Sequence, residues 1–209
     1  MTAVTNVLLA GVGGQGTILA GKILAEVLRR KGHDVKLSEI HGMSQRGGSV
    51  VTYVRFGEKV FAPVVEQGEA DFLLAFEKLE ALRWAPFLRS QGGVVIVNDE
   101  IIQPLAVNLG QAAYPHDVVG RLQGPGRLVI VADGAAMAAQ AGDTRTQNVA
   151  LCGVLARQMV AALRGDWQAV IATMVPPKTV EANLAAFGLG WEAGGRVGQD
   201  QALLVGRSL

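Results

Sequence analysis

A glycine-rich turn between an apolar run and a helical repeat restricts the fold of this chain more than any other feature. Residues 4–10 form a short apolar run, which is typical of a buried parallel strand. The turn Gly11-Val12-Gly13-Gly14-Gln15-Gly16 follows, and apolar residues then recur at helical spacing over residues 17–31. A second strand is predicted over residues 35–40. Residues 4–40 therefore predict a βαβ unit.

The rest of the chain continues to alternate between strands and helices. A strand over residues 49–56 and a tight turn at Gly57-Glu58 lead into residues 59–61, which predicts a β-hairpin. The other predicted elements are the strand 71–76, the helix 79–88, the strands 93–98 and 128–132, and the helices 146–164 and 178–187. These elements predict a Rossmann-like α/β domain over residues 1–190, with a mostly parallel sheet, helices on both faces and a β-hairpin insertion. The glycine-rich stretch from Gly188 is weakly patterned, and residues 191–209 are assigned to a C-terminal extension.

The composition argues against several functional classes. Nineteen Lys and Arg against eighteen Asp and Glu give a formal net charge of +1, whereas a nucleic-acid-binding protein normally carries a large basic excess. The single cysteine, Cys152, excludes an internal disulfide and favours a reduced, cytoplasmic setting. The three histidines are scattered, so no His-rich metal site is predicted. The N-terminal residues do not match a secretory signal, and the absence of a long apolar run predicts no membrane span. Because only 18% of the residues are charged, we expect part of the surface to be covered by another protein.

The glycine turn is the first candidate site. Gly11, Gly13, Gly14, Gln15 and Gly16 are its candidate cofactor-binding or interface residues, because such glycines let a backbone approach an anion at the start of a helix. An acid near the end of the second strand, Glu39, lies where a ribose-binding residue is expected, so the turn alone fits nicotinamide or flavin binding. The alternative is that the glycines only let helix and strand pack closely. Gln15 adds a large amide to the turn, which indicates a specific hydrogen bond or an interface contact.

The second candidate site is the polar loop over residues 41–48. Its candidate residues are His41, Ser44, Gln45, Arg46, Gly47 and Gly48. If the fold is doubly wound, this loop shares the carboxyl edge of the sheet with the glycine turn, where ligands bind. The Arg46 guanidinium could hold a phosphate or a carboxylate; the alternative is a solvated turn. No catalytic group is predicted, since Cys152 fits core packing and Asp133 fits a helix cap.

These motifs together resemble a known family. The glycine turn, the string Glu39-Ile40-His41-Gly42-Met43-Ser44-Gln45-Arg46-Gly47-Gly48-Ser49-Val50, the stretch 68–83 and the helix that contains Asn148 are similar to the gamma-type subunit or domain of the 2-oxoacid:ferredoxin oxidoreductases. The similarity covers about residues 4–190, and the small (beta) subunits of the indolepyruvate branch match best. The Gly-Met-Ser-Gln-Arg-Gly-Gly string is far more specific than the glycine turn.

The resemblance implies a division of labour between subunits. It implies that this chain holds no cofactor and is inactive alone, while a large partner subunit holds thiamine diphosphate and iron–sulfur clusters. The complex would decarboxylate a 2-oxoacid, pass electrons to ferredoxin and form an acyl thioester with coenzyme A as co-substrate. Such a chain could also form a homodimer. Two other hypotheses stay open: a stand-alone nicotinamide-binding protein or redox sensor, and a structural dimerising module.

Overall fold

The computed structural model describes residues 4–41, 48–124 and 126–205. The chain divides into two compact units, Met1–Val131 and Ala132–Leu209. The first unit contains the sheet and both candidate loops. The second unit is built mainly from helices.

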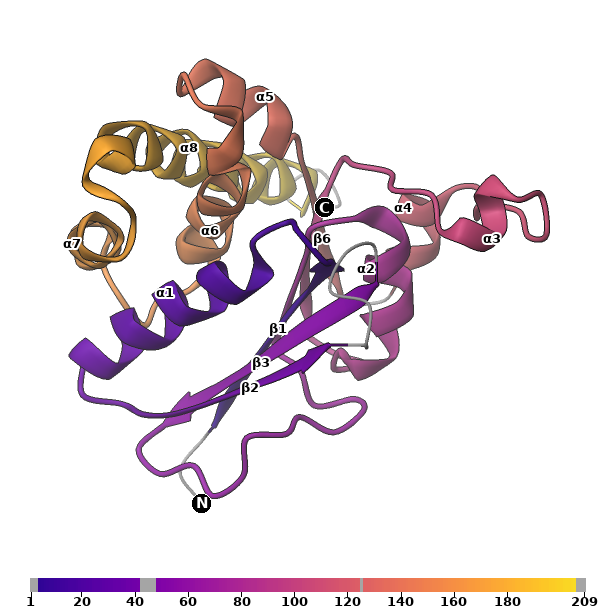
Figure 1. The fold of residues 1–209 in the computed structure, drawn as a ribbon. Helices are drawn as coiled ribbons and strands as arrows, with labels where there is room; N and C mark the ends of the chain where they lie inside the picture. The colour runs from indigo at the N-terminus through magenta and orange to yellow at the C-terminus, as the bar shows by residue number, and fades with distance from the viewer. Residues whose placement is uncertain (1–3, 42–47, 125, 206–209) are drawn as a thin grey trace. The chain divides into compact units, whose positions relative to one another are not determined.

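The sheet of the first unit is mixed. It consists of β1 (Thr5–Val12), β2 (Asp34–His41), β3 (Ser49–Gly57), β4 (Phe72–Ala75), β5 (Val94–Asn98) and β6 (Leu128–Ala132). The spatial order is β2-β3-β1-β4-β5-β6, and Figure 1 shows β3 running between β1 and β2. The strands β1, β4 and β5 are parallel, whereas β3 is antiparallel to both of its neighbours. The predicted α/β fold is therefore confirmed, with one antiparallel strand inserted between the two strands of the first βαβ unit.

The predicted hairpin is wrong in its second strand. Both edges of β3 are already paired, with β1 from Ser49 to Phe56 and with β2 from Val50 to Gly57. No edge of β3 is left for residues 59–61, which form no strand. The backbone N–H of Val60 instead donates to the Asp34 carboxylate, at 2.9 Å, and the Val60 side chain is buried. The antiparallel partners of β3 are instead β1 and β2, which both precede it in the chain.

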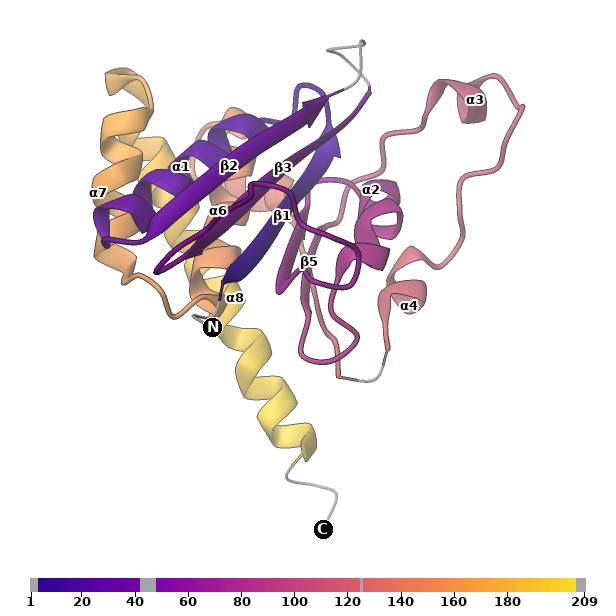
Figure 2. The ribbon, with the colours of Figure 1, turned by 90° about the horizontal axis from the view of Figure 1, so that it is seen from below.

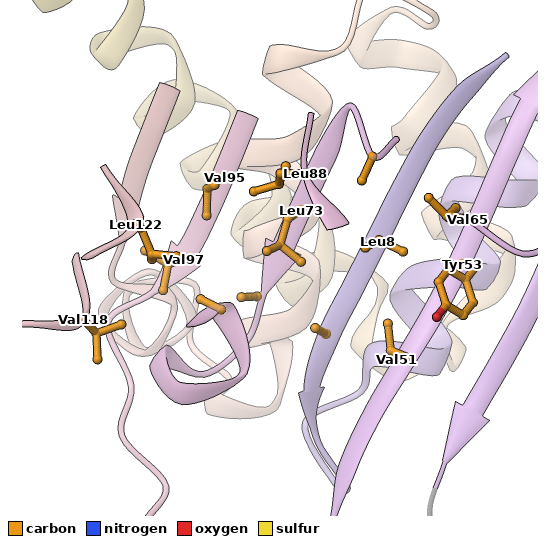
Figure 3. Close-up of a cluster of buried hydrophobic side chains, with 14 residues drawn as sticks. Leu8, Val51, Tyr53, Val65, Leu73, Leu88, Val95, Val97, Val118 and Leu122 are labelled. Carbon is orange, nitrogen blue, oxygen red and sulfur yellow. The ribbon is translucent and has the colours of Figure 1, made fainter. Parts of the chain in front are cut away.

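Helices cover both faces of this sheet (Figure 2). Helix α1 (Thr17–Arg30) packs on β1, β2 and β3 with its apolar side. Helices α2 (Lys78–Trp84) and α4 (Val118–Leu122) lie on the other face, over a core built from alternate strand residues. Figure 3 shows part of that core, where Leu8, Leu73 and Val95 project from three neighbouring strands. A short helix η1 (Ala85–Phe87) follows α2, and α3 (Leu105–Asn108) lies between β5 and α4.

Glycine determines both ends of α1. Gly16 precedes the helix with φ 79° and Gly32 follows it with φ 86°, a left-handed conformation that side chains disfavour. The basic residues Arg29 and Arg30 lie in the last turn, where they interact favourably with the helix dipole. The helix predicted over residues 17–31 is therefore confirmed.

The second unit contains α5 (Gly134–Gln140), α6 (Gln147–Gln158), α7 (Arg164–Met174) and α8 (Val180–Val205), with short η2 (Thr144–Thr146) and η3 (Pro177–Thr179) turns between them. The prediction of a single helix over residues 146–164 is wrong. The observed helix α6 ends at Gln158, and the separate helix α7 starts at Arg164. The Asp166 carboxylate accepts the Leu163 N–H at 2.8 Å and caps α7. The helix predicted over 178–187 is present but continues to Val205.

Helices α6 and α8 approach each other through glycines. A Cβ atom at Gly153 would overlap the Phe187 carbonyl oxygen, and one at Gly190 would overlap the Ala150 carbonyl oxygen. One turn further along, Gln158 donates to the Gly194 carbonyl oxygen at 2.8 Å. This close packing accounts for a long helix in a segment whose glycines disfavour helix formation.

Candidate functional site

The two candidate loops meet at one edge of the sheet. The backbone N–H of Gly13, in the turn after β1, donates to the carbonyl oxygen of Gly48 at 2.8 Å. Gly48 immediately precedes β3, so this bond holds the start of β3 against the glycine turn. Within the turn, Gln15 donates its N–H to the Val12 carbonyl oxygen at 3.1 Å, and Gly14 adopts φ 108°. The glycine turn and Gly48 therefore lie together at the carboxyl edge of the parallel strands, while residues 42–47 of the second loop lie outside the described residues.

The Gln15 side chain ties this edge together. Its Oε1 accepts the Val12 N–H at 2.7 Å, and its Nε2 donates to the Phe76 carbonyl oxygen at 2.9 Å. A Cβ atom at Gly11 would lie 2.9 Å from the same Oε1, so the amide needs a glycine there. The specific hydrogen bond predicted for Gln15 is thus present. It engages the Val12 N–H, which in a phosphate-binding turn would be open to the ligand.

Two polar residues that the sequence reasoning missed complete this network. Asn98, the last residue of β5, donates to the Phe76 carbonyl oxygen at 3.1 Å and to the Glu100 carboxylate at 2.9 Å. Glu100 also accepts from Gln15 at 3.2 Å. The ends of β1, β4 and β5 are therefore joined through the carbonyl oxygen of Phe76 and the carboxylate of Glu100. The available signal was the position of Asn98 at the end of a buried parallel strand and of Glu100 two residues beyond it.

A buried glutamate, Glu77, follows β4 at the same edge. Its side chain is only 1% exposed. One carboxylate oxygen accepts the Glu80 N–H at 3.0 Å and caps α2. The other accepts the Ile102 N–H at 3.2 Å and the Tyr114 hydroxyl at 2.6 Å. Burial and the adjacent Glu77 carboxylate raise the pKa of Tyr114, so the hydroxyl stays a donor at neutral pH.

A second buried glutamate lies one helical turn away. The Glu80 carboxylate accepts a hydrogen bond from the Ser49 hydroxyl, and Arg83 pairs with it at 3.2 Å. Burial raises the pKa of Glu80, while Ser49 and Arg83 act in the opposite direction. These contacts connect the start of β3 to α2. The sequence reasoning used Glu77 and Glu80 only as part of a family pattern and assigned them no role.

A cavity of about 360 Å³ opens beside these carboxylates. Its wall includes Ser49, Glu80 and Arg83 on one side and Leu105 and Asn108 on the other. It combines a hydroxyl, a carboxylate, a guanidinium and an amide with apolar side chains. Such a lining can orient a small polar group, and it offers no activated nucleophile.

The structure does not support the predicted ribose-binding role of Glu39. In a dinucleotide-binding βαβ unit the second strand lies directly beside the first, so that its terminal acid reaches the ligand at the glycine turn. Here β3 separates β1 from β2, and Glu39 pairs with Thr52 on that inserted strand. The acid is displaced by one strand from the turn. Two features favoured a nicotinamide site, the open glycine turn and the acid Glu39. The Gln15 bond to the Val12 N–H argues against the first, and the displacement of Glu39 argues against the second.

Several predicted site residues cannot be placed. Ser44, Gln45, Arg46 and Gly47 lie outside the described residues, and their roles stay predictions. His41 ends β2. Within the described ranges, no group of three or more His, Cys, Asp or Glu side chains could hold a metal ion.

Two further sequence predictions concern single residues of the second unit. Asp133 caps α5 by accepting the Ala136 N–H at 2.8 Å. Cys152 is fully buried in α6, and burial raises the pKa of its thiol to about 12, so it is a packing residue.

Among the helices of the described residues, none combines the length and apolar character needed to cross a membrane.

Comparisons with known proteins agree with the family resemblance. The family model described as pyruvate ferredoxin/flavodoxin oxidoreductase matches residues 6–193. The indolepyruvate oxidoreductase subunit IorB of Thermococcus kodakarensis is 41% identical over 192 residues, covering 90% of this chain and 95% of the relative. The protein of the same name from Pyrococcus horikoshii is 39% identical over 193 residues, with the same coverage.

Solved structures share the fold. The gamma subunit of a keto/oxoacid ferredoxin oxidoreductase from Geobacter sulfurreducens superposes with a TM-score of 0.70 at 23% identity, covering 91% of this chain and 98% of that one. A 2-oxoglutarate:ferredoxin oxidoreductase from Magnetococcus marinus gives a TM-score of 0.73 at 18% identity, covering 92% of this chain and 31% of that longer chain. The family match spans most of the chain and the curated relatives exceed 30% identity, so the chain belongs to the pyruvate ferredoxin/flavodoxin oxidoreductase family.

Proposed function

We propose that this chain is the small subunit of a 2-oxoacid:ferredoxin oxidoreductase whose substrate is indolepyruvate or a similar aryl pyruvate. The observation that carries the proposal is the 41% identity to the indolepyruvate oxidoreductase subunit IorB, over 90% of this chain. The substrate is taken from the names of the relatives. The geometry is compatible, because the described polar groups at the carboxyl edge join the glycine turn to Gly48, Phe76 and Glu100 and so have a structural role.

The cofactors of the reaction belong to the partner in this proposal. Thiamine diphosphate on the larger subunit supplies the decarboxylation chemistry, and iron–sulfur clusters there carry two electrons to ferredoxin. The 2-oxoacid loses carbon dioxide, and its acyl group passes to the thiol of coenzyme A. This chain contains one cysteine, which is buried, whereas a cluster takes about four such ligands. The reaction is assigned to the cytoplasm, where ferredoxin and coenzyme A are available.

The glycine turn and the loop 41–48 are proposed as contacts with the larger subunit or with coenzyme A. The Gly13 N–H joins the glycine turn to the carbonyl oxygen of Gly48, and Gln15 braces the turn by accepting the Val12 N–H. Arg46 is the proposed anion-binding residue of the loop, since a guanidinium matches the geometry of a carboxylate or a phosphate. Ser44 and Gln45 are proposed as its polar neighbours in that contact.

Binding of nicotinamide cofactors separates this proposal from the stand-alone alternative. We expect titration of the purified chain with NADH and NADPH to produce no saturable change, because Gln15 occupies the Val12 N–H and Glu39 lies one strand away from the turn. Co-expression with the larger subunit is expected to yield a complex that stays together through gel filtration. Saturable binding of NADH at micromolar concentration, with no complex formed, would contradict the subunit proposal.

A further inference from the structure

An uncharged arm projects from the first unit between β5 and α4. We define this arm as residues 101–115, a stretch that contains no Asp, Glu, Lys or Arg. Its one helix is α3, and Figures 1 and 2 both show α3 standing away from the sheet and from α2. The side chains of Leu105 and Leu109 are 72% and 61% exposed, and Ile101 is exposed as well.

The arm is held in a defined conformation. The buried Glu77 carboxylate accepts the Ile102 N–H near its start and the Tyr114 hydroxyl near its end. At the tip, the N–H of Leu109 donates to the Leu105 carbonyl oxygen at 2.9 Å, and that of Gln111 to the Ala106 carbonyl oxygen at 2.8 Å. A loop that is already ordered loses little conformational entropy on binding. The exposed leucines are thus presented on a preorganised support.

Charge restricts what can cover this arm. A charged group buried against residues 101–115 would find no countercharge in the arm, and burying an unpaired charge is costly. The partner surface must therefore be apolar or neutral where it meets Leu105 and Leu109. Cavities of about 360 and 380 Å³ flank the arm on the side of Ser49 and on the side of Lys78, so a partner that covers the arm could also fill recesses beside it.

The other chains that contain this fold indicate which partner covers the arm. In the 2-oxoglutarate:ferredoxin oxidoreductase this fold covers 31% of a longer chain, so the rest of that chain is joined to it covalently. The curated relatives have nearly the length of the present chain and are named as subunits. A surface that contacts the rest of the enzyme is then needed on a separate chain.

We propose that the arm is a docking surface for the larger subunit, with Leu105 and Leu109 as its anchors. This inference rests on the proposed function. It deepens that function by naming the segment that faces the partner. The arm shares the cavity near Ser49 with the start of β3, so the docking surface is continuous with the edge that holds the candidate loops.

The test is a double variant, Leu105→Asp with Leu109→Asp. Both side chains are largely exposed, so the melting temperature is expected to stay within about 2 °C of wild type. The dissociation constant for the larger subunit, measured by biolayer interferometry, is expected to rise at least about 100-fold, the effect of losing buried anchor residues and placing charges in a neutral contact.

The matched control is Phe61→Asp. Phe61 is 89% exposed and follows β3, whose end lies at the opposite edge of the sheet from the arm. It should bind the larger subunit within about twofold of wild type, since substitution at an uncovered position changes little. This control separates a specific docking surface from a general effect of an added surface charge.

Three outcomes would overturn the inference. A double variant that binds as tightly as wild type and keeps its oligomeric state would exclude the arm from the contact while leaving the subunit proposal intact. A double variant that binds normally but changes from dimer to monomer in light scattering would assign the arm to a second copy of this chain. A wild-type chain that does not bind the larger subunit would refute the proposed function and this inference together.

Discussion

Replacement of Gly190 by alanine is expected to lower the free energy of unfolding by at least about 2 kcal/mol, the usual scale of overpacking a well-packed contact. The added Cβ would overlap the carbonyl oxygen of Ala150 in the facing helix, and a backbone atom cannot move aside as a flexible side chain can. The alanine gains about 1 kcal/mol in helix propensity, so the net loss measures the closeness of α6 and α8. Urea titration followed by far-UV circular dichroism gives the change directly.

The matched control for this substitution is Gly165→Ala. Gly165 is the second residue of α7, and a Cβ atom there would have nothing within 4 Å. We expect the stability to be unchanged or to rise by up to about 1 kcal/mol. Equal unfolding midpoints for the Gly190 and Gly165 variants would show that the two helices do not need the glycine contact.

Removal of the Glu77 side chain is the second substitution with a large expected effect. Glu77→Ala leaves the N–H groups of Glu80 and Ile102 and the Tyr114 hydroxyl without their acceptor. Hydrogen bonds to a charged acceptor contribute about 1.5–3 kcal/mol each and are not additive, so we expect a loss of about 3 kcal/mol. Tyr114→Phe, which removes one of the three bonds, should lose about 1–2 kcal/mol.

The Glu77 prediction includes a local readout. Both ends of the arm depend on this carboxylate, so thermolysin should cleave residues 101–115 faster in Glu77→Ala than in wild type. Glu58→Ala, at an exposed glutamate, serves as the control and should change neither stability nor cleavage. If Glu77→Ala matches Glu58→Ala in both measurements, Glu77 does not anchor the arm.

The elements with strong local signals could be predicted from the sequence. The run of residues 4–10, the glycine turn and the apolar repeat up to Gly32 all indicate the same structure, and β1 and α1 form there. The position of β3 could not be predicted in this way. The apolar residues of β3 indicate that the strand is buried. They do not indicate its neighbours, and only the structure shows that β3 pairs antiparallel between β1 and β2.

The second unit shows where tertiary packing overrides local preference. Gly188, Gly190 and Gly194 weaken the helical pattern, so the sequence reasoning found little structure after residue 187. Two of these glycines, Gly190 and Gly194, are what let α8 approach α6, and the helix runs to Val205. Conversely, the apolar residues Val160 and Leu163 suggested a helix through residue 164, yet both are exposed where the chain leaves α6 and enters α7.

The candidate site was predicted only in part. Its location at the carboxyl edge and a role for Gln15 followed from the glycine turn. The contributions of Glu77, Asn98 and Glu100 depend on strands that are far apart in sequence, so no local pattern identified them. An acid or amide at or just beyond the end of a buried parallel strand was the signal available, with Glu77 near the end of β4 and Asn98 and Glu100 at the end of β5.

Reconstitution of activity tests the central claim most directly. Indolepyruvate- and coenzyme A-dependent reduction of ferredoxin or viologen is measured with this chain alone, with the larger subunit alone, and with both together. The proposed division of labour predicts turnover only in the mixture, increasing until the two chains are equimolar. Turnover by this chain alone, or an unchanged rate when it is omitted, would contradict its assignment as a required subunit.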